Sequence, residues 1–146
     1  MKIFLDTSSL FKLYHREADT VMIEQIFSQV TVTNVYLSEI TKVEFTSSVW
    51  KKVRTREVTE LEAITTLQLF ERDSTKFTFV ATDSIIIERA RSLTTKYGLK
   101  GLRTLDSIQL SSAISLTTEV GLFVTSDNLL KSLLNDEGLQ TEMPSS

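Results

Sequence analysis

At 146 residues, with 41% hydrophobic and 24% charged side chains, the chain has the composition of an ordinary globular protein, and we expect one domain over residues 1–146. It contains no cysteine, which excludes disulfides and thiolate zinc sites, and its net charge of −3 argues against a protein that coats nucleic acid by bulk electrostatics. No apolar run is long enough to span a membrane, so we expect a cytoplasmic protein without a membrane partner.

Short apolar runs alternate with longer helical patterns from the start of the chain. The apolar run 2–5 predicts a strand, and the helical spacing of apolar residues over 8–29 predicts the helix that follows. A second strand is predicted at 31–37, where valine and threonine are frequent, and a helix begins after Ser38. The capping-box pattern Thr59–Glu62 indicates the start of another helix.

The second half of the chain continues this alternation. Residues 77–81 predict a third strand, and Asp83 or Ser84 is expected to cap a helix that stops near Gly98. The remaining predictions are a helix capped by Thr104, a strand at 121–124, a helix at 127–136 and a candidate fifth strand at 139–143. Strands that alternate with longer helices are typical of a parallel sheet covered by helices on both faces.

Two aspartates stand where predicted strands end and helices begin. Asp6 follows the strand KIFL directly, and Asp127 comes after FVTS. Because ligands of open parallel α/β sheets bind beyond the carboxyl ends of the strands, both residues are candidates for a ligand site. Aspartate is also a common helix cap, and for either residue alone capping is the simpler interpretation.

Two further acidic residues fall near the apolar faces of predicted helices. Asp106 lies in the first turn of its helix, in line with Leu110 and Ala113, so its carboxylate is expected to point inward. Glu44 lies at the edge of the apolar stripe of its own helix. Interaction with the helix dipole explains Asp106 equally well on spacing alone, and an exposed ion pair is the default role for Glu44.

Considered together, the four carboxylates predict a cation site. Like charges that meet in a partly buried crevice repel unless a cation neutralises them. With no cysteine and His15 as the one histidine, the ligands must be oxygen atoms, which favours Mg²⁺, with Mn²⁺ as an alternative. Such an ion, bound by few protein oxygens and by substrate phosphate, suggests phosphodiester chemistry.

Four segments of the chain resemble the motifs of the PIN-domain family, in particular the VapC-type toxins of toxin–antitoxin pairs. These segments are FLDTSSLFKLY, SEITKVEFTSSVW, GLRTLDSIQLSSA and FVTSD. The resemblance maps the family's four metal-binding acidic residues onto Asp6, Glu44 rather than Glu39, Asp106 and Asp127, and an accompanying hydroxyl residue onto Thr125. It implies a three-layer α/β/α sandwich with a five-stranded parallel sheet.

The resemblance also implies an activity and partners. It implies a magnesium-dependent endoribonuclease that cleaves RNA by metal-activated water, forms a homodimer and is bound by a VapB-type antitoxin. We expect Thr7 or Ser8 to supply backbone amides near the site and Thr125 to bond a carboxylate or an ion-bound water. Arg103 is a candidate contact for RNA phosphate. His15 lies about two helical turns beyond Asp6 and is expected on the surface rather than in catalysis.

Two alternatives remain open from the sequence. A PIN-like protein-binding module without catalysis is one, although all four acidic positions carry acidic residues. A phosphorylation-controlled receiver domain explains less, because Asp83 after the third strand has no matching lysine after a last strand. An aspartyl phosphatase of the haloacid-dehalogenase type would require an aspartate where Ser8 stands.

Overall fold

A four-stranded parallel sheet forms the centre of the protein in the computed structural model, which describes residues 1–17 and 20–143. The strands lie in the order β3-β2-β1-β4, and every neighbouring pair is parallel. Their bounds are β1 Lys2–Leu5, β2 Asn34–Ser38, β3 Phe77–Val80 and β4 Leu122–Val124.

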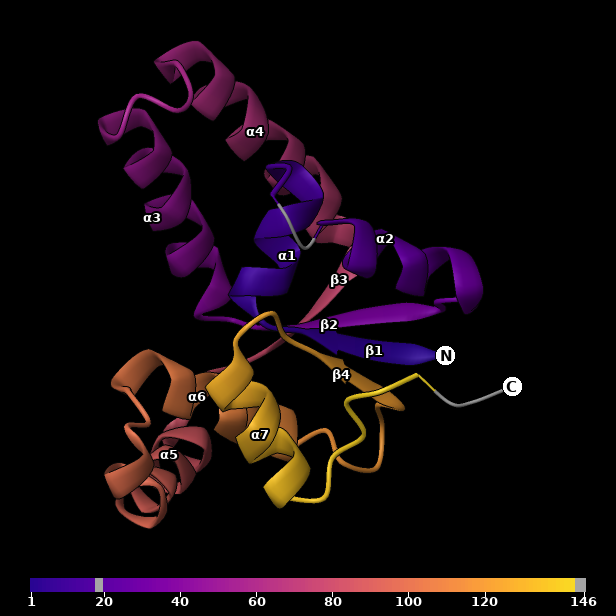
Figure 1. The fold of residues 1–146 in the computed structure, drawn as a ribbon, viewed down its shortest axis with the longest axis vertical. Coiled ribbons are helices and arrows are strands. Elements are labelled where there is room, and N and C mark those ends of the chain that lie inside the picture. Colours follow the sequence, from indigo (N-terminus) through magenta and orange to yellow (C-terminus); the bar gives the residue numbers. More distant parts are fainter. Residues whose placement is uncertain (18–19, 144–146) are drawn as a thin grey trace.

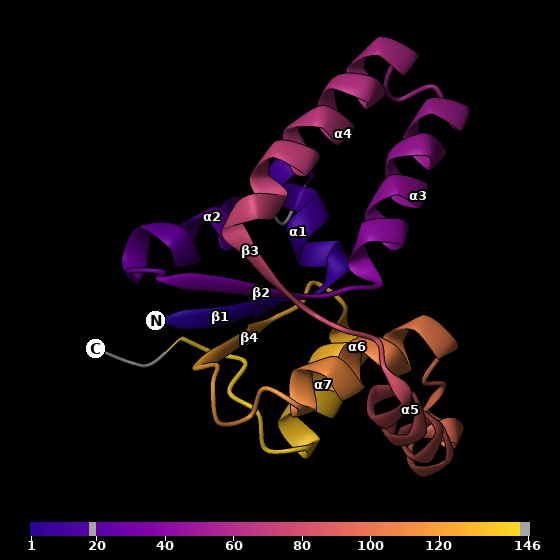
Figure 2. The ribbon, with the colours of Figure 1, turned by 180° about the vertical axis from the view of Figure 1, so that it is seen from behind.

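Helices cover both faces of the sheet, so the predicted three-layer α/β/α architecture is confirmed (Figures 1 and 2). The first face carries α1 Thr7–Tyr14, α2 Thr20–Gln29, α3 Thr41–Arg54 and α4 Glu60–Asp73. The second carries α5 Ser84–Lys96, α6 Thr104–Ile114 and α7 Asn128–Asp136, and two short 3₁₀ turns lie at Ser74–Lys76 and Gly98–Lys100. Within the described ranges, no helix has the length and apolarity needed to cross a membrane.

The alternation of side chains along the strands divides the core into two parts. Ile3 and Leu5 on β1 pack with the helices of the first face, whereas Phe4 between them packs with those of the second. On β4 the same division places Val124 in the first core and Phe123 in the second. A sheet buried on both faces requires apolar residues at successive positions, which explains the short continuous apolar runs in the sequence.

The direction of the connections places a topological switch point between β1 and β4. From β1 the chain runs to β2 and β3 through helices of the first face, then through α5 and α6 to β4 on the other side of β1. Leu5 pairs with Val124, and the N–H of Asp6 donates to the carbonyl of Val124 at 3.2 Å. The segments after these strands therefore diverge from one point, where ligands of such sheets bind.

Two sequence predictions about the elements are wrong. The expected single helix over 8–29 is two helices, because the polar stretch after Tyr14 interrupts the apolar spacing and His15 already has an extended backbone; residues 18–19 of that range lie outside the described residues. The candidate strand at 139–143 is not formed. Among the described residues, one backbone hydrogen bond joins that segment to β4, from the N–H of Phe123 to the carbonyl of Gln140, and one bond does not form a strand ladder.

Local capping signals are confirmed at two helix starts, whereas Thr104 is the first residue of α6 and not its cap. The hydroxyl of Thr59 accepts from the N–H of Glu62 and the Glu62 carboxylate accepts from the N–H of Thr59, both at 3.1 Å. Asp83 accepts from the N–H of Ile86 at 2.9 Å. These bonds satisfy backbone donors that the first turn of a helix leaves free.

An aromatic cluster fixes the α3–α4 hairpin to α1. Phe45 on α3 is fully buried, and its ring centroid lies 4.3 Å from that of Phe70 on α4 and 5.2 Å from that of Tyr14 on α1. The hydroxyl of Tyr14 also donates to Asp73 at 2.6 Å. The cluster thereby sets the position of α3, including Glu44, the residue before Phe45.

Replacing Phe45 with alanine is expected to lower the free energy of unfolding by about 3–5 kcal/mol, because the transfer energy is lost and a cavity opens among packed rings. Urea denaturation followed by circular dichroism measures this loss. Leu61→Ala is the control, since Leu61 is 74% exposed and its removal should change the stability by less than about 0.5 kcal/mol. Similar losses in both variants would contradict the role of the cluster.

Candidate active site

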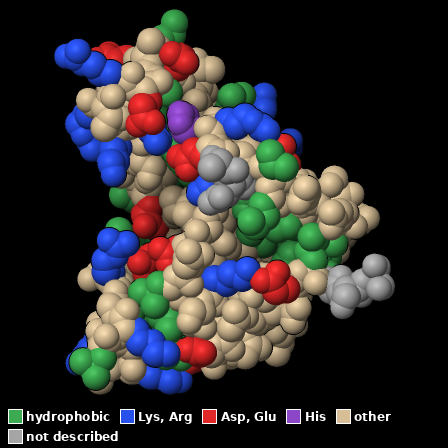
Figure 3. Space-filling view, viewed as in Figure 1, with side chains coloured by type: hydrophobic (Ala, Val, Ile, Leu, Met, Phe, Trp, Pro, Cys, Tyr) green, Lys and Arg blue, Asp and Glu red, His purple; other side chains and the backbone are tan. Residues whose placement is uncertain are grey.

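A cleft of about 370 Å³ opens beyond the carboxyl ends of β1 and β4, between the α3–α4 hairpin and α6. All four acidic residues expected at the site line it: Asp6, Glu44, Asp106 and Asp127. In the space-filling view, acidic side chains gather at the waist between the hairpin and the opposite helix layer, with Lys and Arg side chains to either side (Figure 3). The fold thus brings together residues that are far apart in the sequence.

Asp6 is the most deeply buried of the four, with 4% of its surface exposed. As the N-cap of α1 it accepts from the N–H of Ser9 at 3.0 Å, which is the structural role that the sequence left open. Its carboxylate also accepts from the hydroxyl of Ser8 at 2.8 and 2.9 Å and from that of Thr125 at 2.6 Å. Burial raises the pKa of Asp6, and these hydrogen bonds partly oppose the shift.

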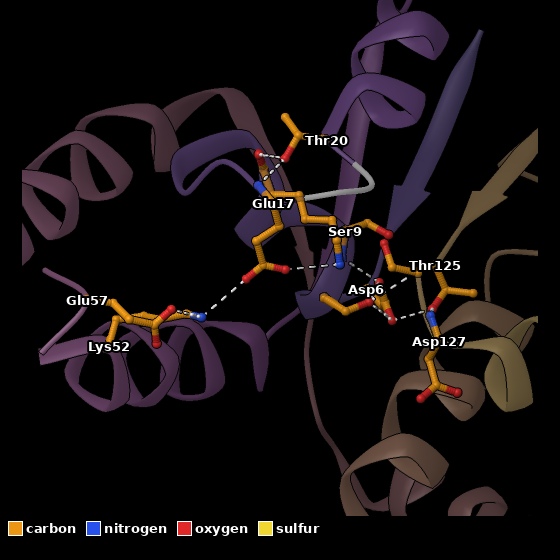
Figure 4. A network of polar contacts seen from close by, with 11 residues as sticks. Asp6, Ser9, Glu17, Thr20, Lys52, Glu57, Thr125 and Asp127 are labelled. Carbon is orange, nitrogen blue, oxygen red and sulfur yellow. Dashed lines mark hydrogen bonds and ion pairs between the residues drawn. The ribbon is translucent and has the colours of Figure 1, made fainter. Parts of the chain in front are cut away.

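Asp127 and Thr125 belong to the segment that follows β4. Asp127 caps α7 by accepting from the N–H of Leu130 at 2.7 Å, and its own N–H donates to the Thr125 hydroxyl at 3.0 Å. Because the Thr125 hydroxyl in turn donates to Asp6, one residue of this segment links the two aspartates (Figure 4). The expected bond from Thr125 to a carboxylate is therefore present.

Glu44 projects from the first turn of α3 into a buried polar group. Its Oε1 accepts from the hydroxyl of Thr7 at 2.9 Å and from the side-chain amide of Gln109 at 2.8 Å. Burial raises the pKa of Glu44, and repulsion from Asp106 and Asp6 adds to the shift, while the two hydrogen bonds oppose it. Thr7 thus contributes its side chain, whereas the sequence suggested a backbone amide.

Asp106 lies in the first turn of α6, with 26% of its side chain exposed. Burial raises its pKa, and repulsion from Asp127 raises it further, while Arg103, whose Nε lies 3.6 Å from Oδ2, opposes the shift. Burial therefore raises the pKa of three of the four carboxylates, and repulsion from neighbouring carboxylates adds to the shift at Glu44 and Asp106.

The donor set fits a hard divalent cation, although the geometry holds no preformed metal cluster. Among the described residues, no group of three Asp, Glu or His side chains is arranged to hold an ion. Mg²⁺ does not require such a cage, since it binds through one or two carboxylates and keeps several waters. The gathering of four carboxylates in one cleft favours a cation here, because positive charge would relieve the repulsion that contributes to the raised pKa values of Glu44 and Asp106.

Basic residues line the same cleft. Lys52 pairs with Glu17 at 3.5 Å and with Glu57 at 3.2 Å, so part of its charge is neutralised within the protein (Figure 4). Lys51 also lines the cleft, as does Arg103, whose side chain is 82% exposed. These positions suit contacts to a phosphate backbone along the acidic centre.

Gln109 is a residue of the cleft that the sequence analysis missed. It is 2% exposed and lies three residues after Asp106, so the helical repeat of α6 was a signal that could have found it. His15, which was expected on the surface, is half-buried and packs on Phe11 with ring centroids 5.4 Å apart, and it is not among the residues that line this cleft.

Asp106→Asn is expected to stabilise the protein at pH 7 in the presence of a chelator. The pKa of Asp106 is higher in the folded state than in the unfolded state, so the folded protein binds the proton more tightly. The free energy of unfolding therefore falls as the pH rises from the ordinary pKa of aspartate through the raised pKa of the folded state. Removing the charge should raise the free energy of unfolding by about 0.5–2 kcal/mol. The gain should vanish below the ordinary pKa of aspartate, where the wild-type group is protonated.

Chemical denaturation at neutral and acid pH measures both effects. Glu88→Gln is the control, because Glu88 is exposed and pairs with Arg91 on the surface of α5. A loss of stability in Asp106→Asn at pH 7 would show that repulsion does not dominate at this position.

Comparison with known proteins identifies the family. The PIN domain family model matches residues 3–133, and no curated protein matches the sequence. VapBC2 from Rickettsia felis, solved with a promoter DNA fragment, contains a chain with a TM-score of 0.66 and 17% identity, covering 97% of this chain and 98% of that chain. FitAcB from Neisseria gonorrhoeae gives a TM-score of 0.69 and 13% identity, and the match covers 95% of each chain.

A third similar structure is VapC20 from Mycobacterium tuberculosis, described as a Sarcin-Ricin loop cleaving toxin. It gives a TM-score of 0.67 and 16% identity, and the match covers 90% of this chain and 94% of that chain. Identities this low establish likeness of fold alone. The family match spans nearly the whole described chain and includes all four acidic positions of the cleft, so this chain belongs to the PIN-domain family.

Proposed function

We propose that this protein is a magnesium-dependent endoribonuclease and the toxin of a VapBC-type toxin–antitoxin pair, with Mn²⁺ as an alternative ion. The observation that carries the proposal is the meeting of Asp6, Glu44, Asp106 and Asp127 in one cleft. They come from four separate segments of the chain, and their repulsion calls for a cation. The basic residues of the cleft support a phosphate-bearing substrate.

In this proposal Asp6, Asp106 and Asp127 would hold one or two divalent cations, and Glu44 would bind directly or through water. A divalent cation in such a site supplies Lewis-acid activation of water and stabilises charge on the phosphate. Ser8 and Thr125 favour the ionised form of Asp6 and fix its orientation by donating hydrogen bonds to it. Arg103, exposed at the cleft beside Asp106, is placed to contact the RNA backbone.

The proposed partners follow from the fold. Solved chains of similar fold come from complexes described as VapBC or FitAB, some of them bound to DNA, which supports a VapB-type antitoxin for this chain. A homodimer is part of the proposal as well. A PIN-like module without catalysis would need the same fold but no cluster of carboxylates. The acidic cleft therefore favours the nuclease over the binding module.

Cleavage of RNA by the purified protein should require Mg²⁺ and should fall at least about 100-fold in Asp6→Asn and in Asp106→Asn. Each substitution removes charge that holds the cation, and the cation accounts for several kcal/mol of transition-state stabilisation. A gel assay on single-stranded RNA with Mg²⁺ or chelator measures this, and Glu88→Gln serves as the surface control. Equal cleavage by all four proteins would rule out the assigned site, and no cleavage by any of them would favour the binding module.

Expression of the chain alone in a bacterial host should arrest growth, as expected for a toxin that cleaves RNA. Asp6→Asn, expressed to the same level, should restore growth because the acidic centre is incomplete. Growth curves together with immunoblots measure both. Arrest by Asp6→Asn equal to that by the wild type would contradict a toxicity based on this site.

A further inference from the structure

The side chain of Gln109 connects three elements at the floor of the cleft. Its Nε2 lies 2.8 Å from Oε1 of Glu44 on α3 and 3.0 Å from the hydroxyls of Thr7 and Thr41. These partners are separated from Gln109 by 65 to 102 positions in the sequence. The amide is therefore a meeting point of α6 with α1 and α3, next to one of the proposed cation ligands.

The hydrogen-bond donors and acceptors of this group allow a consistent arrangement. A carboxylate can only accept, so Thr7 and the Gln109 amide nitrogen must both donate to Oε1 of Glu44. The hydroxyl of Thr41 lies 3.0 Å from that of Thr7 and donates a hydrogen bond to the Thr7 oxygen. The Thr41 oxygen in turn accepts the second amide hydrogen of Gln109. Every donor in the group is satisfied.

The orientation of the Gln109 amide follows from the same argument. If the amide were turned over, its oxygen would face Oε1 of Glu44 at 2.8 Å, and two acceptors would repel. In the orientation present, the buried Gln109 Oε1 has no hydrogen-bond partner among the described residues. Leaving this oxygen unpaired costs free energy. The hydrogen bond from the amide nitrogen to Glu44 offsets that cost and so fixes the orientation of the amide.

Both hydrogen bonds to Glu44 reach the same oxygen. Counted over the residues that the structure describes, Oε1 takes the bonds from Thr7 and Gln109, and Oε2 takes none. A carboxylate held through one oxygen by two donors has little freedom to rotate. The second oxygen is then kept available to the cleft that Glu44 lines.

We infer that Gln109 is a positioning residue that holds the Glu44 carboxylate with Oε2 free for a divalent cation, an inference that rests on the proposed function. Groups that orient metal ligands typically change metal affinity 10- to 100-fold when they are removed. Gln109→Leu should therefore weaken Mn²⁺ binding by about that factor, since leucine fills the space without donating a hydrogen bond.

The test measures Mn²⁺ binding to the chelator-treated chain by electron paramagnetic resonance of the free ion, without any RNA. Ser112→Ala is the matched control, because Ser112 is equally buried on α6 but bonds to Ser38 and does not line the cleft. Its affinity should stay within about twofold of the wild type. Gln109→Met, with an unbranched side chain of similar length, tests the same loss should Gln109→Leu fail to fold.

A double variant separates positioning from a general structural role. If Gln109 acts through Glu44, adding Gln109→Leu to Glu44→Gln should weaken Mn²⁺ binding no further than Glu44→Gln alone. Losses that multiply in the double variant would overturn the inference, as would an unchanged Mn²⁺ affinity in a folded Gln109→Leu or Gln109→Met protein. A wild-type chain that binds no Mn²⁺ would overturn the proposed metal dependence and the inference with it.

Discussion

The repulsion among the carboxylates beyond the carboxyl ends of β1 and β4 is the interaction on which the arrangement of the rest of the site depends. Burial and like charge both raise the pKa values of Glu44 and Asp106, so the folded chain carries an electrostatic cost in the absence of a counterion. Hydrogen bonds from hydroxyl and amide groups oppose that cost without removing it.

The fold offsets part of this electrostatic cost by placing each carboxylate at the start of a helix. Asp6 and Asp127 are N-caps, and Glu44 and Asp106 lie in first turns, so all four stand near the positive ends of helix dipoles. The capping role and the proposed binding role are therefore compatible, since a carboxylate that accepts one backbone bond retains lone pairs for other partners.

Packing of buried residues outside the cleft sets the positions of the side chains that line it. Glu44 precedes Phe45, whose ring is enclosed by aromatic side chains of α1 and α4. On the opposite wall, Ser112 and Ser111 of α6 bond to Ser38 and to the carbonyl of Ile86, which holds that helix close to β2 and α5. The packing on both sides of the cleft brings Glu44 and Gln109 into contact, whereas Arg103 is exposed and contacts the edge of the acidic centre, at Asp106.

The sequence by itself determined the order of strands and helices, the three layers, and the position of Asp6 and Asp127 after strands, because these depend on local periodicity and capping. It did not determine the break after Tyr14 or the absence of a strand at 139–143, where short apolar patterns have more than one solution. Helical spacing already indicated that Asp106 points inward, whereas Glu44 was assigned mainly by resemblance, and Gln109 was missed. Only the tertiary structure brought Gln109 to Glu44 across 65 residues, because contacts between helices depend on how whole elements pack.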